Sequence, residues 1–130
     1  MSIKSYDFTK EIKRQLQEYT REVITDINER AKVITKRGVK ELKQISPKRP
    51  KGGDYAKSWT YKEKVFGNAP TRFTVHNKDH YRLTHLLEHG HAIEGGSKRT
   101  KAQPHIKEVE EKMVNEYIEA TKEVIKNGRR

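Results

Sequence analysis

The stretch "YAKSWTYKEKVFGNAPTRFTVHN", residues 55–77, decides the fold because its apolar residues recur at every second position. Trp59 and Tyr61 alternate with polar residues, and Phe73 and Val75 do the same after the turn-like "GNAP". This alternation predicts a β-hairpin over residues 55–77 with one face exposed to water. Because two strands alone are marginally stable, the hairpin needs helices to pack against.

A long amphipathic helix is predicted before the hairpin, over residues 1–45. Its apolar side chains recur at spacings of three and four, which places them on one face: Phe8, Ile12, Leu16, Tyr19, Val23, Ile27, Ala31 and Ile34. Gly38 weakens this helix by about 1 kcal/mol relative to alanine, and Ser46-Pro47 ends it. Since the rest of the chain is too small to cover the whole face, we expect part of it to pack against another subunit.

Two further helices are predicted after the hairpin. The first spans residues 80–90, ends at Gly90 as its C-cap, and carries four apolar side chains: Tyr81, Leu83, Leu86 and Leu87. The second spans residues 104–127, with Pro104 in its first turn. The change of period from 3.6 to 2 and back predicts a single α+β domain over residues 1–130. In it, the long N-terminal helix and the C-terminal helix pack on a small, mainly antiparallel sheet.

The composition restricts the classes of protein. Apolar residues make up only 32% of the chain and charged residues 36%, so the core is thin and completion by a partner subunit is a real possibility. The absence of cysteine excludes disulfides and thiolate chemistry. With neither a signal peptide nor an apolar run long enough to span a bilayer, we expect a soluble protein made inside the cell.

The net charge of +11 is concentrated in part of the chain. Between residues 30 and 64, twelve Lys and Arg residues face three acids. This pattern is typical of contact with nucleic acid or an acidic protein surface, and equally of a well-solvated surface. The basic loops at residues 46–54 and 91–103 carry six candidate interface cations: Lys48, Arg49, Lys51, Lys98, Arg99 and Lys101.

The most concentrated group of titratable residues is "HLLEHGHAIEGG", residues 85–96. Its first five letters match the H-x-x-E-H signature of a class of zinc peptidases, with Glu88 in the position of the base. A metal site would draw on four histidines: His85, His89, His91 and His105. However, Gly90 ends the helix directly after His89, and no third ligand for a catalytic zinc is evident. Hydrogen bonding of the rings to nearby carbonyls or carboxylates is the ordinary structural alternative.

The order of these motifs resembles the head–tail joining, or tail-completion, family of long-tailed phages, often labelled gene-product-ten-like. The resemblance runs from about residue 54 to the end. It rests on "GDYAKSW", "VHN", "YRLTHLLEHGH", the pair Gly95-Gly96 and "PHI". Tyr55 departs from the family, in which an aliphatic residue is common, and the basic loop at residues 46–54 is more basic than is typical. The resemblance marks twelve motif residues as structural: Tyr81, Leu83, His85, Leu86, Leu87, Glu88, Gly90, His91, Gly95, Gly96, Pro104 and His105.

The resemblance implies a structural virion protein without catalytic residues or cofactors. Such a protein acts in the phage neck, in a ring expected to be hexameric, between the head-closure protein on the portal and the tail terminator or tail tube protein. It is often a monomer in the host cytoplasm before assembly, and DNA passes through the lumen of the ring. We read the motif as a packed corner in which His85 and Glu88 hydrogen-bond locally. The two alternatives are a basic nucleic-acid-binding module and a His-based metal-binding protein, which a metal analysis would detect.

Overall fold

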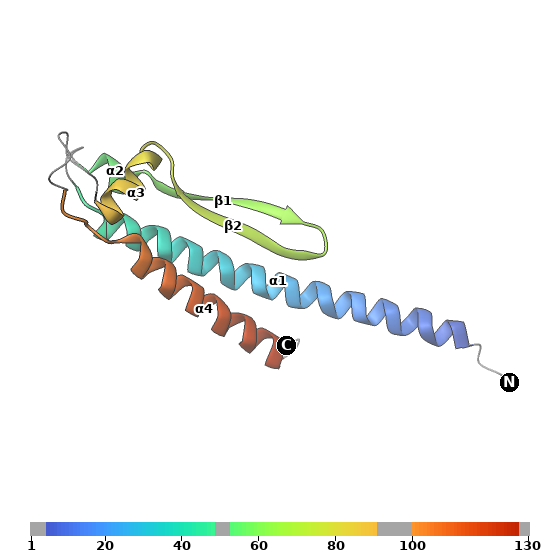
Figure 1. Ribbon diagram of the computed structural model, residues 1–130. Coiled ribbons are helices and arrows are strands. Elements are labelled where there is room, and N and C mark those ends of the chain that lie inside the picture. Colours follow the sequence, from blue (N-terminus) through green and yellow to red (C-terminus); the bar gives the residue numbers. More distant parts are fainter. Residues whose placement is uncertain (1–4, 49–52, 91–99, 128–130) are drawn as a thin grey trace.

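The computed structural model describes residues 5–48, 53–90 and 100–127, with side chains described from residue 10 onward. Along the chain it contains α1 (Ser5–Ile45), α2 (Asp54–Lys57), β1 (Trp59–Phe66), β2 (Ala69–Asn77), α3 (Tyr81–His89) and α4 (Ile106–Asn127). Figure 1 shows the hairpin and α4 lying along α1, with α2 and α3 gathered at its C-terminal end. The predicted α+β class is therefore confirmed. No helix of the described residues is long and apolar enough to cross a membrane.

Helix α1 is the axis of the molecule. Its 41 residues span about 60 Å at 1.5 Å per residue. The C-terminal half of the predicted apolar stripe is buried, with Ile27, Ala31 and Ile34 all in the core. The N-terminal half extends beyond the other elements (Figure 1), and there Ile12 and Leu16 remain 56% and 60% exposed. The stripe is continuous in sequence, but this chain covers only half of it.

The two strands form one antiparallel hairpin. The register pairs Trp59 with Asn77 and Lys64 with Arg72, and it shifts between Lys64 and Phe66. The predicted hairpin is wrong at its start, where the Asp54–Lys57 segment is a turn of helix. Gly53 adopts a positive φ of 95°, and Tyr55 is buried in the core. The packing of Tyr55 therefore overrides the local alternation that suggested a strand.

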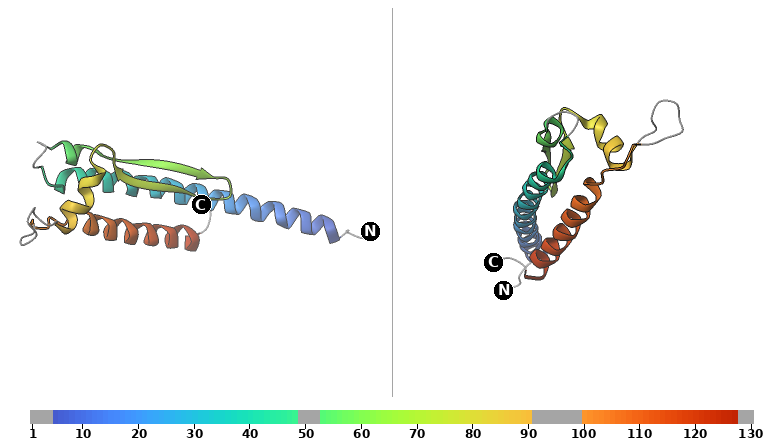
Figure 2. Two further views of the ribbon diagram at one scale, coloured as in Figure 1. Left: turned by 45° about the horizontal axis from the view of Figure 1, so that its top comes forward. Right: turned by 90° about the vertical axis from the view of Figure 1, so that its left-hand side faces the viewer.

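Helix α4 packs along α1 on a different side from the hairpin, as the end-on view of Figure 2 shows. The centre of the core draws on every layer: Val39, Leu42, Tyr55, Trp59 and Val109. Helix α4 begins at Ile106, two residues later than the predicted start at Pro104. The later start has a cause outside the helix, because the carboxylate of Glu88 in α3 accepts hydrogen bonds from the backbone N–H groups of residues 105–107.

Gly38 of α1 lies against the side chain of Met113 of α4. A Cβ at this position would lie 2.2 Å from Sδ and 2.9 Å from Cγ of Met113. The glycine that weakens α1 locally thus makes room for the side chain that joins the two helices.

We predict that Gly38→Ala lowers the free energy of unfolding by about 1 kcal/mol, because the overpacking cost exceeds the gain in helix propensity. In a Met113→Ala background the same substitution should instead stabilise the protein by about 1 kcal/mol, since only the propensity gain remains. Urea denaturation of the four proteins in this cycle measures both values. Stabilisation in both backgrounds would show that Met113 moves aside without cost.

Candidate functional site

The Glu88 side chain caps the N-terminus of α4 from α3. It is only 8% exposed. Its Oε1 accepts hydrogen bonds from the backbone N–H groups of His105 and Ile106, at 2.7 and 2.9 Å, and its Oε2 accepts one from Lys107 at 3.0 Å. The first N–H groups of a helix have no partner within the helix, and a carboxylate there also interacts favourably with the helix dipole. Burial raises the pKa of Glu88, but these N–H donors outweigh it and hold the pKa below its ordinary value of 4.5.

The His105 ring lies buried beneath this cap. Its Nδ1 is 2.7 Å from the carbonyl oxygen of Gln103, and its Nε2 is 2.7 Å from the Tyr55 hydroxyl. A carbonyl only accepts, so Nδ1, which also lies 3.3 Å from Oε1 of Glu88, carries a proton, and Nε2 hydrogen-bonds to the Tyr55 hydroxyl. Burial, with the charge of Glu88, raises the pKa of Tyr55, which keeps this hydroxyl protonated as a donor.

The contacts of Tyr55 continue to the end of α1. Its ring meets the edge of Trp59 at 5.7 Å between centroids. Trp59 Nε1 donates to Ser46 Oγ at 2.8 Å, and Ser46 Oγ donates to the carbonyl of Leu42. A continuous path of buried contacts therefore joins the C-terminus of α1, α2, β1, α3 and the start of α4.

Asn77 closes the other side of this corner. Its Nδ2 donates to the carbonyl of Tyr55 at 2.8 Å, and its Oδ1 accepts from the backbone N–H of His80 at 2.8 Å. One amide therefore fixes both the turn before β1 and the chain entering α3. The resemblance includes this asparagine, but its partners are not evident from sequence.

Gly90 is the C-cap of α3, as predicted, with φ 73° and ψ 169°. A Cβ there would lie 2.6 Å from the backbone oxygen of Thr100. The chain returns so closely that the backbone N–H of Gln103 donates to the carbonyl of Leu87 at 2.7 Å. The glycine in this motif is required by both its conformation and the available space.

The prediction that Glu88 hydrogen-bonds locally is wrong, because the hydrogen bonds described for Glu88 reach residues 105–107 instead. His85 and His89 are exposed, and their rings lie 4.8 Å apart. The carboxylate that would act as a peptidase base is thus buried and committed to α4. Among the described residues, no group of three or more His, Cys, Asp or Glu is placed to hold a metal ion.

The other motif residues have different environments. Leu83 and Leu87 pack against the core, whereas Tyr81, Leu86 and Pro104 are exposed. Of the motif residues, three lie outside the described part of the chain: His91, Gly95 and Gly96.

The candidate interface cations are only partly described. Lys48 caps the C-terminus of α1, with its Nζ donating to the carbonyls of Lys43 and Gln44 at 2.7 and 3.2 Å. Lys101 is exposed. The other four lie outside the described residues: Arg49, Lys51, Lys98 and Arg99. Lys48 therefore has a structural contact that the basic loop did not suggest.

Comparison with known families identifies the chain. A family model described as "Bacteriophage HK97-gp10, putative tail-component" matches residues 10–90. This match covers more than half of the chain and includes most of α1, the hairpin and α3 as far as Gly90. Searches of curated proteins and of solved structures gave no match. The chain therefore belongs to the HK97-gp10-like family of bacteriophage tail components.

Proposed function

We propose that this protein is a structural subunit of the phage neck that joins the filled head to the tail. In this role it forms a ring, sixfold by its resemblance to the family, between the head-closure protein on the portal and the tail terminator or tail tube protein. It acts by binding other proteins and has no catalytic centre. It is made in the host cytoplasm and ends in the virion neck.

The uncovered half of the α1 stripe is the observation that carries this proposal. Ile12, Leu16 and Tyr19 lie at spacings of four and three on one face of α1, and all three are exposed. A helix that extends from a small domain with its apolar face in water loses hydrophobic stabilisation unless a partner covers that face. A subunit of a larger assembly has such a partner. Lys48 and Lys101, near the C-terminal end of α1, remain predicted interface residues for a neighbouring subunit.

We expect that deleting the gene leaves filled heads and separate tails, and that Leu16→Asp fails to restore virion yield when supplied in trans. Leu16 is exposed in the single chain, so the melting temperature should change little. Burying an unpaired charge in an interface should cost about 2 kcal/mol or more of binding. Virion counts and electron microscopy of lysates measure the effect.

Gln17→Asp is the matched control, because it adds the same charge one position away from the stripe. It should restore virions almost fully. Normal virion yield from the deletion phage would contradict the neck role itself. Full activity of Leu16→Asp would instead show that the exposed stripe is not part of the assembly surface.

A further inference from the structure

The outer face of the hairpin is strongly basic. Lys64 and Arg72 are directly opposed in the strand register, although like charges in such pairs repel each other. Both cations lie over the Phe66 ring, at 5.5 and 5.3 Å from its centroid. The only carboxylate of the two strands, Glu63, binds Lys32 of α1 at 3.2 Å on the inner face. No carboxylate of the two strands is therefore placed to offset the repulsion between Lys64 and Arg72, and an acidic partner would reduce it.

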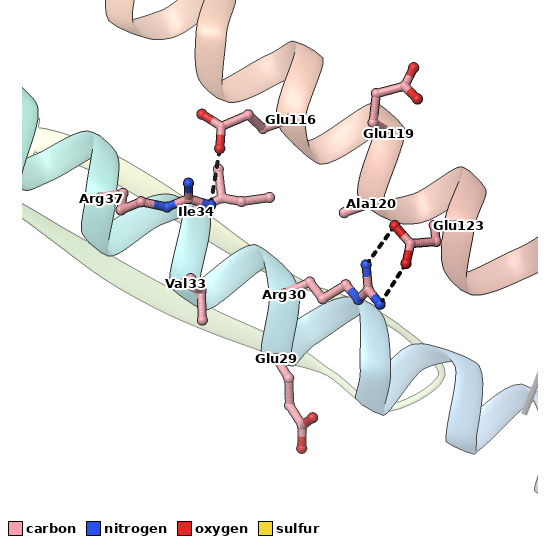
Figure 3. Close-up of a pocket in the computed structure, with 9 residues that line it drawn as sticks. All are labelled: Glu29, Arg30, Val33, Ile34, Arg37, Glu116, Glu119, Ala120 and Glu123. Carbon is pink, nitrogen blue, oxygen red and sulfur yellow. Dashed lines mark hydrogen bonds and ion pairs between the residues drawn. The ribbon is translucent and has the colours of Figure 1, made fainter. Parts of the chain in front are cut away.

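A groove of about 470 Å³ lies between α1 and α4 and has the opposite charge. Figure 3 shows Arg30 paired with Glu123 and Arg37 with Glu116 across it, at 3.1 and 3.0 Å. Its lining also includes Glu29 and Glu119, which lie at opposite edges of the groove in Figure 3, and Glu119 pairs with Lys122 at 3.8 Å. With four carboxylates and two guanidinium groups, the lining residues carry a net charge of −2. In a chain of net charge +11, this is a local reversal of sign.

The lining of the groove is also partly apolar. Val33, Ile34 and Ala120 contribute to it, and Val33 is exposed. The basic face of the hairpin also carries an apolar side chain, the half-buried Phe66, whose ring lies beneath Lys64 and Arg72. Both surfaces therefore combine an apolar contact with charges of opposite sign.

The two surfaces lie on different sides of α1. Asn28 and Lys32 face the hairpin, since Asn28 accepts from the Thr71 N–H and Lys32 binds Glu63. At 100° per residue, Val33 and Arg37 of the groove point well away from them. In Figure 3 the hairpin runs behind α1. The basic and acidic surfaces of one chain therefore cannot meet, but those of two copies can.

We propose that copies of this chain associate head to tail, with the outer hairpin face of one copy docked in the acidic α1–α4 groove of the next. Lys64 and Arg72 would approach the acidic edges of the groove at Glu29 and Glu119, and Phe66 would lie over its apolar part. Because the two surfaces differ, the contact is heterologous and repeats around a ring. This inference rests on the proposed ring and specifies its subunit contact.

The test uses two charge-reversed proteins. One carries Glu29→Lys and Glu119→Lys in the groove, and the other carries Lys64→Glu and Arg72→Glu in the hairpin. For each variant alone, the yield of cross-linked protein should fall about tenfold or more relative to the wild type, because like charges then face each other. An equal mixture should cross-link again, because each hairpin then meets a groove of opposite sign.

Unchanged melting temperatures show that both variants fold, and Glu110→Lys with Glu111→Lys is the control for an acid-to-base change elsewhere on α4. A wild-type protein that cross-links neither in solution nor in assembled virions would overturn the proposal, and so would a mixture that cross-links no better than either variant alone. So would a hairpin variant that cross-links normally but loses binding to a short DNA duplex. Cross-linking of the mixture together with normal virion yield after gene deletion would retain the contact and reject the neck role.

Discussion

Glu88→Ala should lower the free energy of unfolding by about 3 kcal/mol. The substitution removes the carboxylate that accepts hydrogen bonds from three backbone N–H groups at the start of α4. Each buried donor that finds no other partner costs about 1–3 kcal/mol. Water reaching the exposed side of the helix start limits the total. Chemical denaturation followed by circular dichroism measures the change.

The loss should depend on pH, because the folded protein holds the pKa of Glu88 below 4.5. A depressed folded-state pKa contributes stability that is complete above the unfolded-state pKa and is lost as the pH falls through the folded-state value. Glu88→Gln removes this titration but keeps one carbonyl oxygen. We therefore expect the wild type to exceed Glu88→Gln in stability at pH 7 and the difference to shrink below about pH 4.5.

Glu110→Ala is the matched control, since this carboxylate is exposed one turn further along α4. It should change stability by less than about 0.5 kcal/mol. If Glu88→Ala costs no more than the control, other acceptors must satisfy the N-terminus of α4 and the corner does not depend on Glu88.

Helices and strands in which apolar side chains recur at a constant spacing over many residues could be predicted from the sequence. The stripe of α1 predicted its length, and the alternation at Trp59, Tyr61, Phe73 and Val75 predicted the hairpin. Periodicity reports which face is apolar but not what covers it. The small size of the chain predicted that part of the stripe stays uncovered, but not that Ile27 is the buried end and Ile12 the exposed one.

The corner could not be predicted because its partners are distant in the sequence and several of them are backbone groups. Glu88 binds N–H groups 17–19 residues away, and Tyr55 binds His105 across 50 residues. Backbone N–H groups cannot be identified from residue types, so H-x-x-E-H gave no indication that Glu88 caps a helix. The strand predicted at Tyr55 failed for a related reason, since four residues are too few for local pattern to resist a long-range contact.

Gly90→Ala should be as destabilising as the loss of Glu88, at about 3–4 kcal/mol. The φ of 73° with ψ of 169° lies in a region open almost only to glycine, which costs about 1–3 kcal/mol for another residue. In addition, the new Cβ would lie 2.6 Å from the backbone oxygen of Thr100. Relief of this clash requires the chain from Thr100 to Gln103 to move, which pulls on the start of α4.

Gly53→Ala separates the two causes, because Gly53 also has a positive φ, of 95°, but the nearest atom to its Cβ would be Lys57 Cε at 4.0 Å. It should cost about 1–2 kcal/mol, from backbone conformation alone. The additional loss of unfolding free energy at Gly90 then measures how tightly residues 100–103 pack on α3. Denaturation of the two variants gives this difference directly. Equal losses at the two glycines would mean that the chain near Thr100 moves freely. In that case the position of α4 would depend on Glu88 and His105 and not on this close approach.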